Sequence, residues 1–501
     1  MHQGTGPTDH EGAATEGEAR CPYSAGGALE LHRGGELPWR RLRERHGGLV
    51  PVELEPGVPG WLLLGYKENL QVLRDQTYFS ADPRPWGAAG VPVRSEALGL
   101  DGAGHQRLRA PIVDALARAD TARLVPVVER AAVHLLGRVA AEGRADLVGG
   151  YAAPLPALVL NELFGLPDEY GRLLADVAER SWSTDPGEAA SAEREAHGYF
   201  RGLVERKRRE PGEDLAGHLL AHPNALTDEE AAQALALVWR SGHEPTTHLI
   251  GNSLLRLLED PAVWTAYLGG TLTPEDFVDH VMWTDPPLRV MAGRYSAMDL
   301  RFAGAHIRRG EPLLFGLASA HADPSVSGGR DEAVSMAGNR SHLSWGAGAH
   351  RCPATAFSRE VVRTALDLAV DRLRGMVLAV EPADLRWRPS LSVHGLEELP
   401  VWFTATGERA QRDEERPPDR GPARTWIRRS RRPAGQGARY QAPLAGPARE
   451  GAAAAEAVAA APRPRRRAPQ GAGARYQAPF AEKEAVPDPL DRLLADWRSR
   501  R

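Results

Sequence analysis

Cysteine is scarce in this chain of 501 residues, and long hydrophobic runs are absent. The two cysteines, Cys21 and Cys352, lie far apart, which argues against a disulfide framework and for a reducing compartment. The longest apolar stretches, such as Trp61-Leu-Leu-Leu64, are too short to span a bilayer. The acidic, Gly-rich segment from Met1 to Glu18 lacks the basic and apolar regions of a signal peptide. These absences predict a soluble, cytoplasmic protein without a transmembrane segment.

Lysine is also scarce, so the positive charge of the chain is almost entirely arginine. Only Lys67, Lys207 and Lys483 are lysines, whereas alanine and glycine are abundant. We interpret this bias as a feature of genome composition and not of function. The formal net charge of −4 is small for this length and singles out no class of partner.

The composition changes along the chain in a way that predicts four segments. Residues 1–20 are predicted to be disordered, and residues 21–405 carry the apolar patterning of a globular domain dominated by helices. Residues 406–485 are rich in Pro, Gly, Ala and Arg, cannot bury a core, and are predicted to be a disordered tail. Residues 486–501 are predicted to form a short amphipathic helix.

The clearest predicted helix runs from Thr227 to Glu259. It begins with a capping box, Thr227-Asp-Glu-Glu230, and ends at Asp260-Pro261. Pro245 lies in its middle, where proline removes one backbone hydrogen bond. Other expected elements are early strands at Leu49–Leu54 and Trp61–Gly65, mixed strand and loop from Leu300 to Ala318, a helix from Ala354 to about Leu373, and short strands from Asp384 to Phe403.

The tail contains a repeat and ends with a helix signal. Gly437-Ala-Arg-Tyr-Gln-Ala-Pro-Leu444 recurs as Gly473-Ala-Arg-Tyr-Gln-Ala-Pro-Phe480, each time after a cluster of arginines. Asp488 can cap a helix, Pro489 suits its first position, and one face carries Leu490, Leu493, Leu494 and Trp497. Two interpretations stay open: a low-complexity linker, or a segment (residues 424–501) that docks a partner protein and folds on binding.

Cys352 lies in the stretch Leu343-Ser-Trp-Gly-Ala-Gly-Ala-His-Arg-Cys-Pro-Ala354. Gly346 and Gly348 can adopt positive φ, so the loop can turn tightly enough to point sulfur at a metal. A metal-bound thiolate also needs backbone N–H groups aimed at the sulfur. The alternatives are a buried structural cysteine, the usual fate of a lone intracellular cysteine, and a zinc site, which lacks a second Cys-His pair at ligand spacing.

This stretch resembles the haem-binding loop of cytochrome P450, Phe-x-x-Gly-x-His-x-Cys-x-Gly. Trp345 replaces the Phe and Ala354 replaces the last Gly. The resemblance implies a mainly α cytochrome P450 fold over residues 21–405, haem b (iron protoporphyrin IX) as cofactor, and Cys352 as the axial iron ligand. It also implies that Trp345, Gly346, Gly348 and His350 contact the cofactor, His350 through a propionate.

Two further segments resemble the parts of the family that bind the haem propionates. Gly104-His-Gln-Arg-Leu-Arg109 matches a helix that supplies His and Arg, and His105 and Arg109 share one helix face. Asp285-Pro-Pro287 followed by Gly293-Arg-Tyr-Ser-Ala-Met-Asp299 places Arg294 where the family has another propionate-binding Arg. Cations that pair with propionates make charge-assisted hydrogen bonds. For His105 and Arg109, a solvated helix face is the alternative.

The middle of the long helix resembles the oxygen-binding bend of the family, small residue-Gly-x-acid-Thr. In Ser241-Gly-His-Glu-Pro-Thr-Thr247, Gly242 would open a groove above the iron and Glu244 stands at the acid position. Pro245 replaces the Thr that helps to deliver protons to bound oxygen. Thr246 lies about 100° further around the helix and could substitute only if the proline kink rotates the turn. Water held by Glu244 is another proton route, and a solvated acid is the structural alternative.

The sequence departs from the family before Asp285-Pro-Pro287, where a Glu-x-x-Arg pair normally braces the loop that leads to the cysteine. His280 stands at the Glu position and Trp283 at the Arg position. Because both partners are replaced, we expect a packed, hydrogen-bonded substitute in which Trp283 fills the space. These departures resemble an actinobacterial group of cytochromes P450 that is often encoded in operons called conservons, beside a sensor-kinase-like protein and a small GTPase.

The resemblance implies a haem-thiolate monooxygenase that inserts one oxygen atom of O2 into a small hydrophobic substrate, with Gly242, Glu244 and Thr246 as catalytic residues. Its electrons would come from a ferredoxin and an NAD(P)H-dependent ferredoxin reductase. The alternative is a haem-binding sensor or assembly partner in a signalling operon, with weak or no monooxygenase activity. The loss of the Thr and of Glu-x-x-Arg and the long tail favour it. The Arg clusters are short and lack interleaved aromatics, so the tail favours neither membrane nor nucleic-acid attachment.

Overall fold

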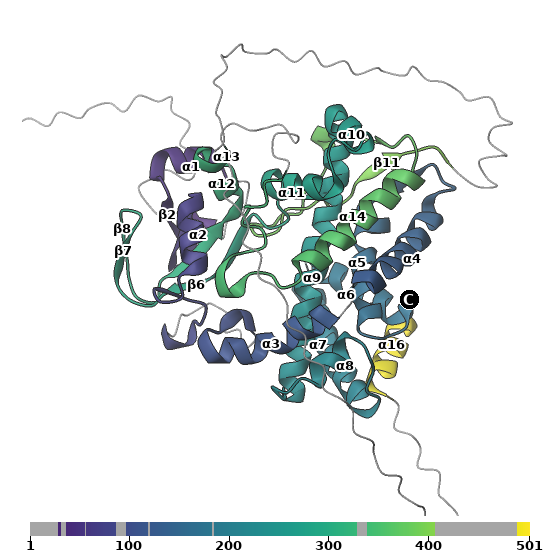
Figure 1. Ribbon diagram of the computed structural model, residues 1–501, viewed down its shortest axis with the longest axis horizontal. Helices are drawn as coiled ribbons and strands as arrows, with labels where there is room; N and C mark the ends of the chain where they lie inside the picture. The colour runs from purple at the N-terminus through teal and green to yellow at the C-terminus, as the bar shows by residue number, and fades with distance from the viewer. Residues whose placement is uncertain are drawn as a thin grey trace, which may run out of the picture. The chain divides into compact units, whose positions relative to one another are not determined.

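The computed structural model describes residues 29–31, 37–55, 57–86, 97–118, 121–182, 185–327, 338–405 and 488–500. Residues 1–20 and 406–485, which were predicted to be disordered, lie outside the described residues, as do both copies of the repeat. In the described part of the chain helices predominate beside small sheets (Figure 1), which confirms the predicted mainly α class.

The helices that position the candidate site follow the chain order. Their bounds are α1 (Trp39–His46), α2 (Tyr66–Arg74), α3 (Gly102–Arg118), α4 (Thr121–Val139), α5 (Pro154–Leu163), α6 (Asp168–Arg180), α7 (Pro186–Arg209), α8 (Leu215–Leu220), α9 (Asp228–Glu259), α10 (Pro261–Leu268), α11 (Pro274–Thr284), α12 (Leu317–His321), α13 (Pro324–Ser327), α14 (Thr355–Arg372) and α16 (Pro489–Ser499). None of these helices is long and apolar enough to cross a membrane.

The strands are short and belong to three sheets in the described part of the chain. Their bounds are β1 (Leu29–Glu30), β2 (Leu49–Glu55), β3 (Val58–Leu63), β4 (Phe79–Ser80), β5 (Arg144–Asp146), β6 (Val290–Ser296), β7 (Leu300–Phe302), β8 (Ala305–Ile307), β9 (Pro312–Gly316), β10 (Val377–Leu378) and β11 (Pro400–Trp402). The sheet orders are β1-β2-β3-β9-β6-β4, β10-β11-β5 and β7-β8.

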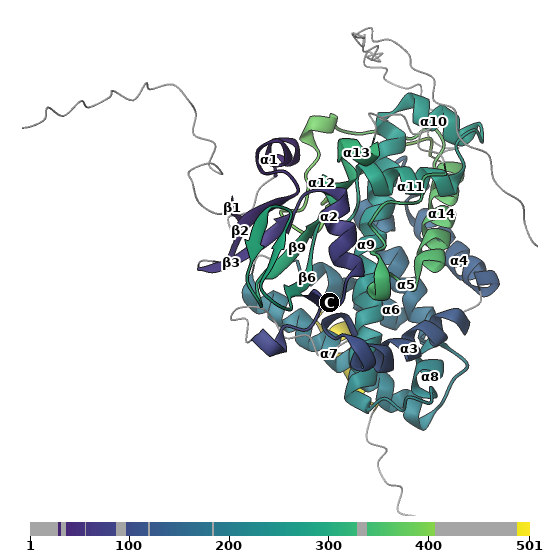
Figure 2. The ribbon, with the colours of Figure 1, turned by 60° about the vertical axis from the view of Figure 1, so that its left-hand side comes forward.

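The six-stranded sheet lies to one side of the helices and is packed between α1 and α2 (Figure 2). Side chains alternate along β3, so Leu62 packs in the cluster that contains Leu42 of α1, while Leu63 packs in the one that contains Val72 of α2. The expected strand from Trp61 instead begins at Val58, because the antiparallel pairing with β2 extends to Glu55.

Helix α9 is the central element of the helical part and contacts α5, α7, α11 and α14. Its start confirms the predicted capping box: Thr227 Oγ1 accepts from the Glu230 N–H, and the Glu230 carboxylate accepts from the Thr227 N–H. Most of its faces are buried, which is why a single helix of this length is stable in the interior. Pro245 lies inside α9 without ending it.

Candidate functional site

The loop that carries Cys352 is closed by backbone hydrogen bonds. The Cys352 N–H donates to the Trp345 carbonyl at 2.8 Å, and the Gly346 N–H donates to the Leu343 carbonyl at 2.8 Å. Gly346 and Gly348 have φ of +68° and +69°, the left-handed conformation that the sequence predicted for this turn. The helix α14 begins three residues after Cys352, at Thr355. The thiol is therefore fixed between a tight turn and a helix.

Gly348 also allows the loop to pack closely on α2. A Cβ at this position would lie 2.6 Å from the carbonyl oxygen of Leu73 and 3.0 Å from Cα of Arg74. A Cβ at Gly346 would meet nothing closer than 3.8 Å. Only Gly348 is therefore required both by the turn and by its neighbour.

The environment of Cys352 contains opposing electrostatic effects. Burial raises the pKa of the thiol, while the Ala354 N–H and the guanidinium groups of Arg109 and Arg351 oppose that rise. Arg109 extends from α3 to this loop and donates a hydrogen bond to the Arg351 carbonyl. A metal ion bonded to sulfur would add a far larger positive charge, which holds a coordinating thiol deprotonated.

His105 of α3 and His350 of the cysteine loop stack with their ring centroids 4.0 Å apart. Nε2 of His350 lies 3.3 Å from Oδ1 of Asp101, and Oδ2 of Asp101 accepts from the Ser80 hydroxyl and from the Ala81 N–H. Burial raises the pKa of Asp101, but these hydrogen bonds outweigh it and lower the pKa to about 2. Asp101 therefore fixes the orientation of His350 as an ionised acceptor.

Several buried nitrogen atoms of the residues predicted to contact haem have no hydrogen-bond partner in the part of the chain that the structure describes. They are Nε2 of His105, Nδ1 of His350, Nε of Arg294 and Nε1 of Trp345. Burial, followed by the nearby charges of His350 and Arg109, lowers the pKa of His105 to about 4. The Arg294 Nε–H is a donor, and an unpartnered buried donor is costly, so this site fits a bound anion that would accept its hydrogen bond.

The residues predicted to contact haem lie on three segments that are distant in the sequence, and the fold brings them to one place. Arg109 lies beside Cys352, His105 stacks on His350, and Arg294 of β6 is buried nearby, where the positive charge of Arg294 lowers the pKa values of both histidines. The two guanidinium groups of Arg109 and Arg294 match the charge of two carboxylates and can donate hydrogen bonds to them. The donor set and the thiol together fit the predicted haem.

On the central helix, Glu244 lies between two imidazoles. Its Oε2 is 3.1 Å from Nε2 of His248, and its Oε1 is 3.5 Å from Nδ1 of His243. Burial raises the pKa of Glu244, but the interactions with His243 and His248 outweigh it and hold the pKa well below its usual range. His243 is fixed in turn through Nε2, which lies 2.9 Å from the Ala153 carbonyl. The pair of Glu244 with His248 was not anticipated from the sequence, although the spacing i, i+4 on a helix could have indicated it.

The other two residues predicted on this helix have different surroundings. A Cβ at Gly242 would lie 3.3 Å from Cδ1 of Leu160, so this position faces α5. Thr246 is buried. The loop after α6 approaches the same turn of α9, because the Trp182 ring lies 6.4 Å from the His248 ring. Gly242 and Thr246 stay predictions as catalytic residues.

A buried carboxylate on α11 stands next to the positions where Glu-x-x-Arg is missing. Asp279 is 1% exposed, and its Oδ1 lies 3.0 Å from Nε2 of His342 and accepts from the Arg359 guanidinium of α14. Nε of Arg340 lies 3.4 Å from Oδ2. We call Asp279, Arg340, His342 and Arg359 the Asp279 cluster. It joins α11 and α14 to the segment that leads to Cys352.

Trp283 reinforces the same segment, as the sequence predicted. Its Nε1 donates to the Asn339 carbonyl at 3.0 Å, and its ring stacks on Tyr66 with centroids 6.2 Å apart. One turn of α11 also holds Ser344, whose Oγ donates to the Met282 carbonyl at 3.0 Å. The expected packed and hydrogen-bonded substitute for Glu-x-x-Arg is therefore present. Asp279 was missed because it lies one residue outside the expected motif.

No family profile matches the chain as a whole or in part. The chain is 28% identical over 360 residues to a biotin biosynthesis cytochrome P450 of Bacillus subtilis (strain 168), over 69% of this chain and 90% of that protein. It is 28% identical over 417 residues to the cytochrome P450 monooxygenase PikC of Streptomyces venezuelae, over 80% of this chain and 95% of that protein. It is also similar, with a TM-score of 0.65 and 27% identity, to a solved cytochrome P450 in complex with an acyl carrier protein that carries hexadec-9Z-enoic acid, over 73% of this chain and 97% of that chain. These likenesses confirm the predicted fold.

Proposed function

We propose, from the premise that this chain is a member of the cytochrome P450 superfamily, that it is a haem-thiolate monooxygenase acting on a small hydrophobic substrate. The fold and relatives covered over 90% or more of their length strongly support the premise. The observation that carries the proposal is the loop of Cys352 beside a set of buried cationic and imidazole nitrogen atoms without partners among the described residues.

Haem b is the cofactor of this fold, and each predicted contact has a chemical role. Cys352 would be the axial ligand, with its loop held by Gly346 and Gly348. Arg109 and Arg294 would donate to the propionates as cations, and His105 and His350 would contact them through ring nitrogen atoms that have no other partner among the described residues. Trp345 would pack beside the ligand and direct its indole N–H into the site. Residues 21–405 would form the haem domain.

The bound haem supplies the oxygen-activating chemistry, and thiolate ligation favours O–O cleavage. The reaction consumes O2, two electrons and two protons, and yields the hydroxylated substrate and water. Glu244 is suited to pass protons, because it stays ionised and lies 3.1 Å from His248. Pro245 has no N–H, so the Ser241 carbonyl lacks its helical donor and can hold a water molecule. Thr246, the residue after Pro245, can supply a hydroxyl group to the same proton path.

A ferredoxin and its NAD(P)H-dependent reductase are the proposed electron donors in the cytoplasm. The exposed Arg351 next to Cys352 supports an acidic protein docking near the ligand. The substrate class rests on the relatives, one of which is solved with a fatty acid on acyl carrier protein. We also propose that the chain is of the conservon-associated actinobacterial group, since His280 and Trp283 replace Glu-x-x-Arg.

The test is the carbon monoxide difference spectrum of the reduced, purified protein. We expect the strongly red-shifted Soret band of thiolate-ligated haem, and we expect Cys352→Ser to lose that band while the protein still folds. A band typical of histidine or neutral-thiol ligation would reject the thiolate assignment. A protein that binds no haem would reject the cofactor and the monooxygenase proposal together.

The second candidate is a haem-binding sensor or assembly partner with weak or no turnover. The observation that favours it is Pro245, which occupies the position of the oxygen-activating Thr inside an otherwise continuous α9. Oxidation of NADPH through a generic ferredoxin system, measured with and without hydrophobic compounds that shift the haem spin state, separates the two candidates. Spin shifts without any product would favour the sensor.

A further inference from the structure

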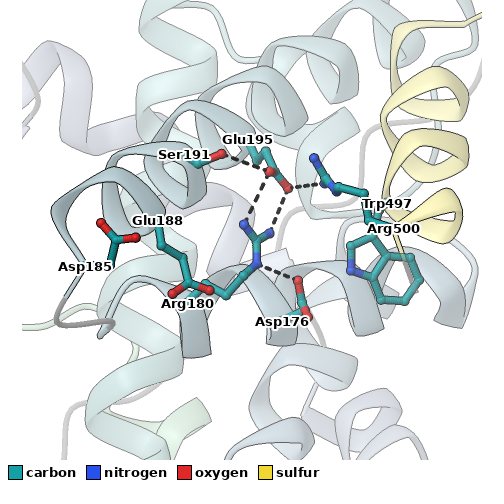
Figure 3. Close-up of a pocket in the computed structure, with 8 residues that line it drawn as sticks. All are labelled: Asp176, Arg180, Asp185, Glu188, Ser191, Glu195, Trp497 and Arg500. Carbon is teal, nitrogen blue, oxygen red and sulfur yellow. Dashed lines mark hydrogen bonds and ion pairs between the residues drawn. The ribbon is translucent and has the colours of Figure 1, made fainter.

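The C-terminal helix α16 packs against α6 and α7 (Figures 1 and 3). We call the surface of these two helices that α16 covers the α6–α7 groove. Leu490, Leu494 and Trp497 occupy one face at i, i+4 and i+7, and they are 0%, 5% and 8% exposed. They belong to the same core cluster as Tyr170 of α6 and Tyr199 of α7. The apolar face that the sequence offered to a partner is therefore covered by the chain's own globular part.

The charges of α16 match those of the groove at both ends. The helix lies antiparallel to α7, so its acidic start meets the basic last turn of α7 and its basic end meets carboxylates. The ion pairs at the start are Arg206–Asp488 (3.0 Å), Arg206–Asp491 (2.8 Å) and Arg209–Asp488, and those at the end are Arg500–Glu195 (2.9 Å) and Arg498–Glu169. This complementarity fixes the direction of the bound helix as well as its position.

Glu195 connects all three helices at the end of the groove. Figure 3 shows Arg180 of α6 and Arg500, the residue that follows α16, converging on the Glu195 carboxylate of α7; the hydrogen bonds are 2.8 and 2.9 Å long. The same arginine of α6 reaches Asp176 at 2.8 Å. A docked α16 therefore adds a second guanidinium to the carboxylate through which Arg180 joins α6 to α7.

A glycine on α7 marks where the two helices touch. A Cβ at Gly202 would lie 2.9 Å from Cγ and 3.2 Å from the backbone N of Leu490. A Cβ at Gly198, one turn earlier, would meet nothing within 4 Å. Gly202 thus makes room for α16, and Gly198 supplies a matched position on the same helix that does not.

The groove is connected to the candidate site through the loop between α6 and α7. Trp182 on this loop lies edge-on to His248, with the ring centroids 6.4 Å apart, and the Arg388 guanidinium lies 5.2 Å from the Trp182 ring centroid. His248 is the partner of Glu244. Trp182 lies on the loop that joins α6 to α7, so it links these two helices to the turn of α9 that carries His248.

We propose that the α6–α7 groove is a recognition site for an amphipathic helix with an acidic start and a basic end, and that α16 occupies it reversibly in cis. A helix of this length is not stable alone, so it folds as it docks, and residues 406–487 keep it near the groove. In the docked state α16 holds Trp182 over His248 and slows entry of ligands to the haem site; only this last clause rests on the proposed function.

Hydrogen exchange of the full-length chain tests the docking. Gly202→Leu should block the groove and raise exchange of the amides in residues 489–499 to that of a free peptide, whereas Gly198→Leu should leave their protection unchanged. Leu490→Asp, which acts from the helix side, should repeat the effect of Gly202→Leu. Equal exchange in the wild type and in all three variants would overturn the proposal.

A fluorescent peptide of residues 486–501 tests reversibility. Full-length protein with Leu490→Asp and Trp497→Ala keeps the groove but disables its own helix, so it should bind the peptide about tenfold or more tightly than the wild type, whose groove is occupied. Equal binding by both would show that α16 does not occupy the groove. If sedimentation shows that the wild type is a dimer and that Gly202→Leu is a monomer, α16 docks on a second copy of the chain and not on its own groove, and docking in cis is overturned.

The coupling to the haem site has a separate readout. In Gly202→Leu, imidazole should bind the ferric haem severalfold faster by stopped flow than in Gly198→Leu. An unchanged rate, with the exchange results as expected, would remove the coupling but keep the helix site. Failure of the protein to bind haem would affect the proposed function alone, because exchange and peptide binding need no cofactor.

Discussion

Oδ1 of Asp279 lies 3.0 Å from Nε2 of His342, and the same oxygen accepts from the Arg359 guanidinium. These residues lie on α11, on the segment before Cys352 and on α14. The carboxylate is almost fully buried, and among the described residues these neighbours and Arg340 compensate its charge. The Asp279 cluster does for this chain what the missing Glu-x-x-Arg pair was expected to do.

Asp279→Ala should destabilise the protein strongly, because it leaves the Arg359 guanidinium and His342 without their buried acceptor. Loss of one partner of a buried pair costs about 3–5 kcal/mol in the free energy of unfolding. Glu275→Ala, on the same helix but in a half-exposed pair, should cost at most about 1 kcal/mol. Urea unfolding measures both. The carbon monoxide spectrum of Asp279→Asn should also show less thiolate-ligated haem, and an unchanged spectrum would mean that the cluster does not position the loop.

Gly348→Ala should impair the cysteine loop more than Gly346→Ala. Both substitutions force an L-residue into positive φ, at a cost of about 1–2 kcal/mol. Only the methyl group at position 348 would also meet the backbone of α2, at 2.6 Å from the Leu73 carbonyl oxygen. Haem retention after gel filtration and the midpoint of thermal unfolding should therefore be highest in the wild type, lower in Gly346→Ala and lowest in Gly348→Ala. The reverse order would show that contact with α2 is unimportant.

His280→Phe should change how stability depends on pH. The imidazole is 1% exposed, and burial, helped by Arg256, lowers its pKa to about 4. Between pH 6.5 and 4 the unfolded chain binds a proton that the native state does not, so stability falls as the pH falls. A shift of this size corresponds to about 3 kcal/mol over the window. Unfolding at pH 7 and pH 5 should show that the phenylalanine variant loses less stability on acidification. Parallel losses would contradict the assignment.

Glu244→Gln should be destabilising at neutral pH and less so in acid. Because the native pKa of Glu244 is depressed, its contribution is present above the ordinary carboxyl pKa and is lost as the pH falls toward the native value. Loss of charge-assisted hydrogen bonds costs about 1.5–3 kcal/mol. Glu259→Gln, at the end of the same helix, is the contrast, since burial followed by the charge of Asp285 raises the pKa of Glu259. That variant should not lose stability at neutral pH; equal losses in both variants would reject this account.

The local features of this protein follow from its sequence because they depend on neighbours along the chain. The capping box at Thr227, the positive φ of Gly346 and Gly348, and the start of the last helix at Asp488 and Pro489 each need only a few adjacent residues. The spacing of His105 and Arg109 places both on one face of α3 for the same reason. The order of the motifs was enough to predict the fold, and the similarity to solved cytochromes P450 confirms that fold.

Other features depend on which distant segments meet, and only the tertiary structure decides this. Asp279 carries no motif, and its role follows from Arg359 and His342, which are brought to it by the packing of α14 and the cysteine loop on α11. The pairing of Glu244 with His248 depends on the burial of both in a helix that crosses the domain. The apolar face of the last helix predicted that another apolar surface covers it. The sequence alone does not say what, because the surface that α16 contacts combines Tyr170 of α6 with Gly202 and Glu195 of α7, and these come together only when the two helices have packed.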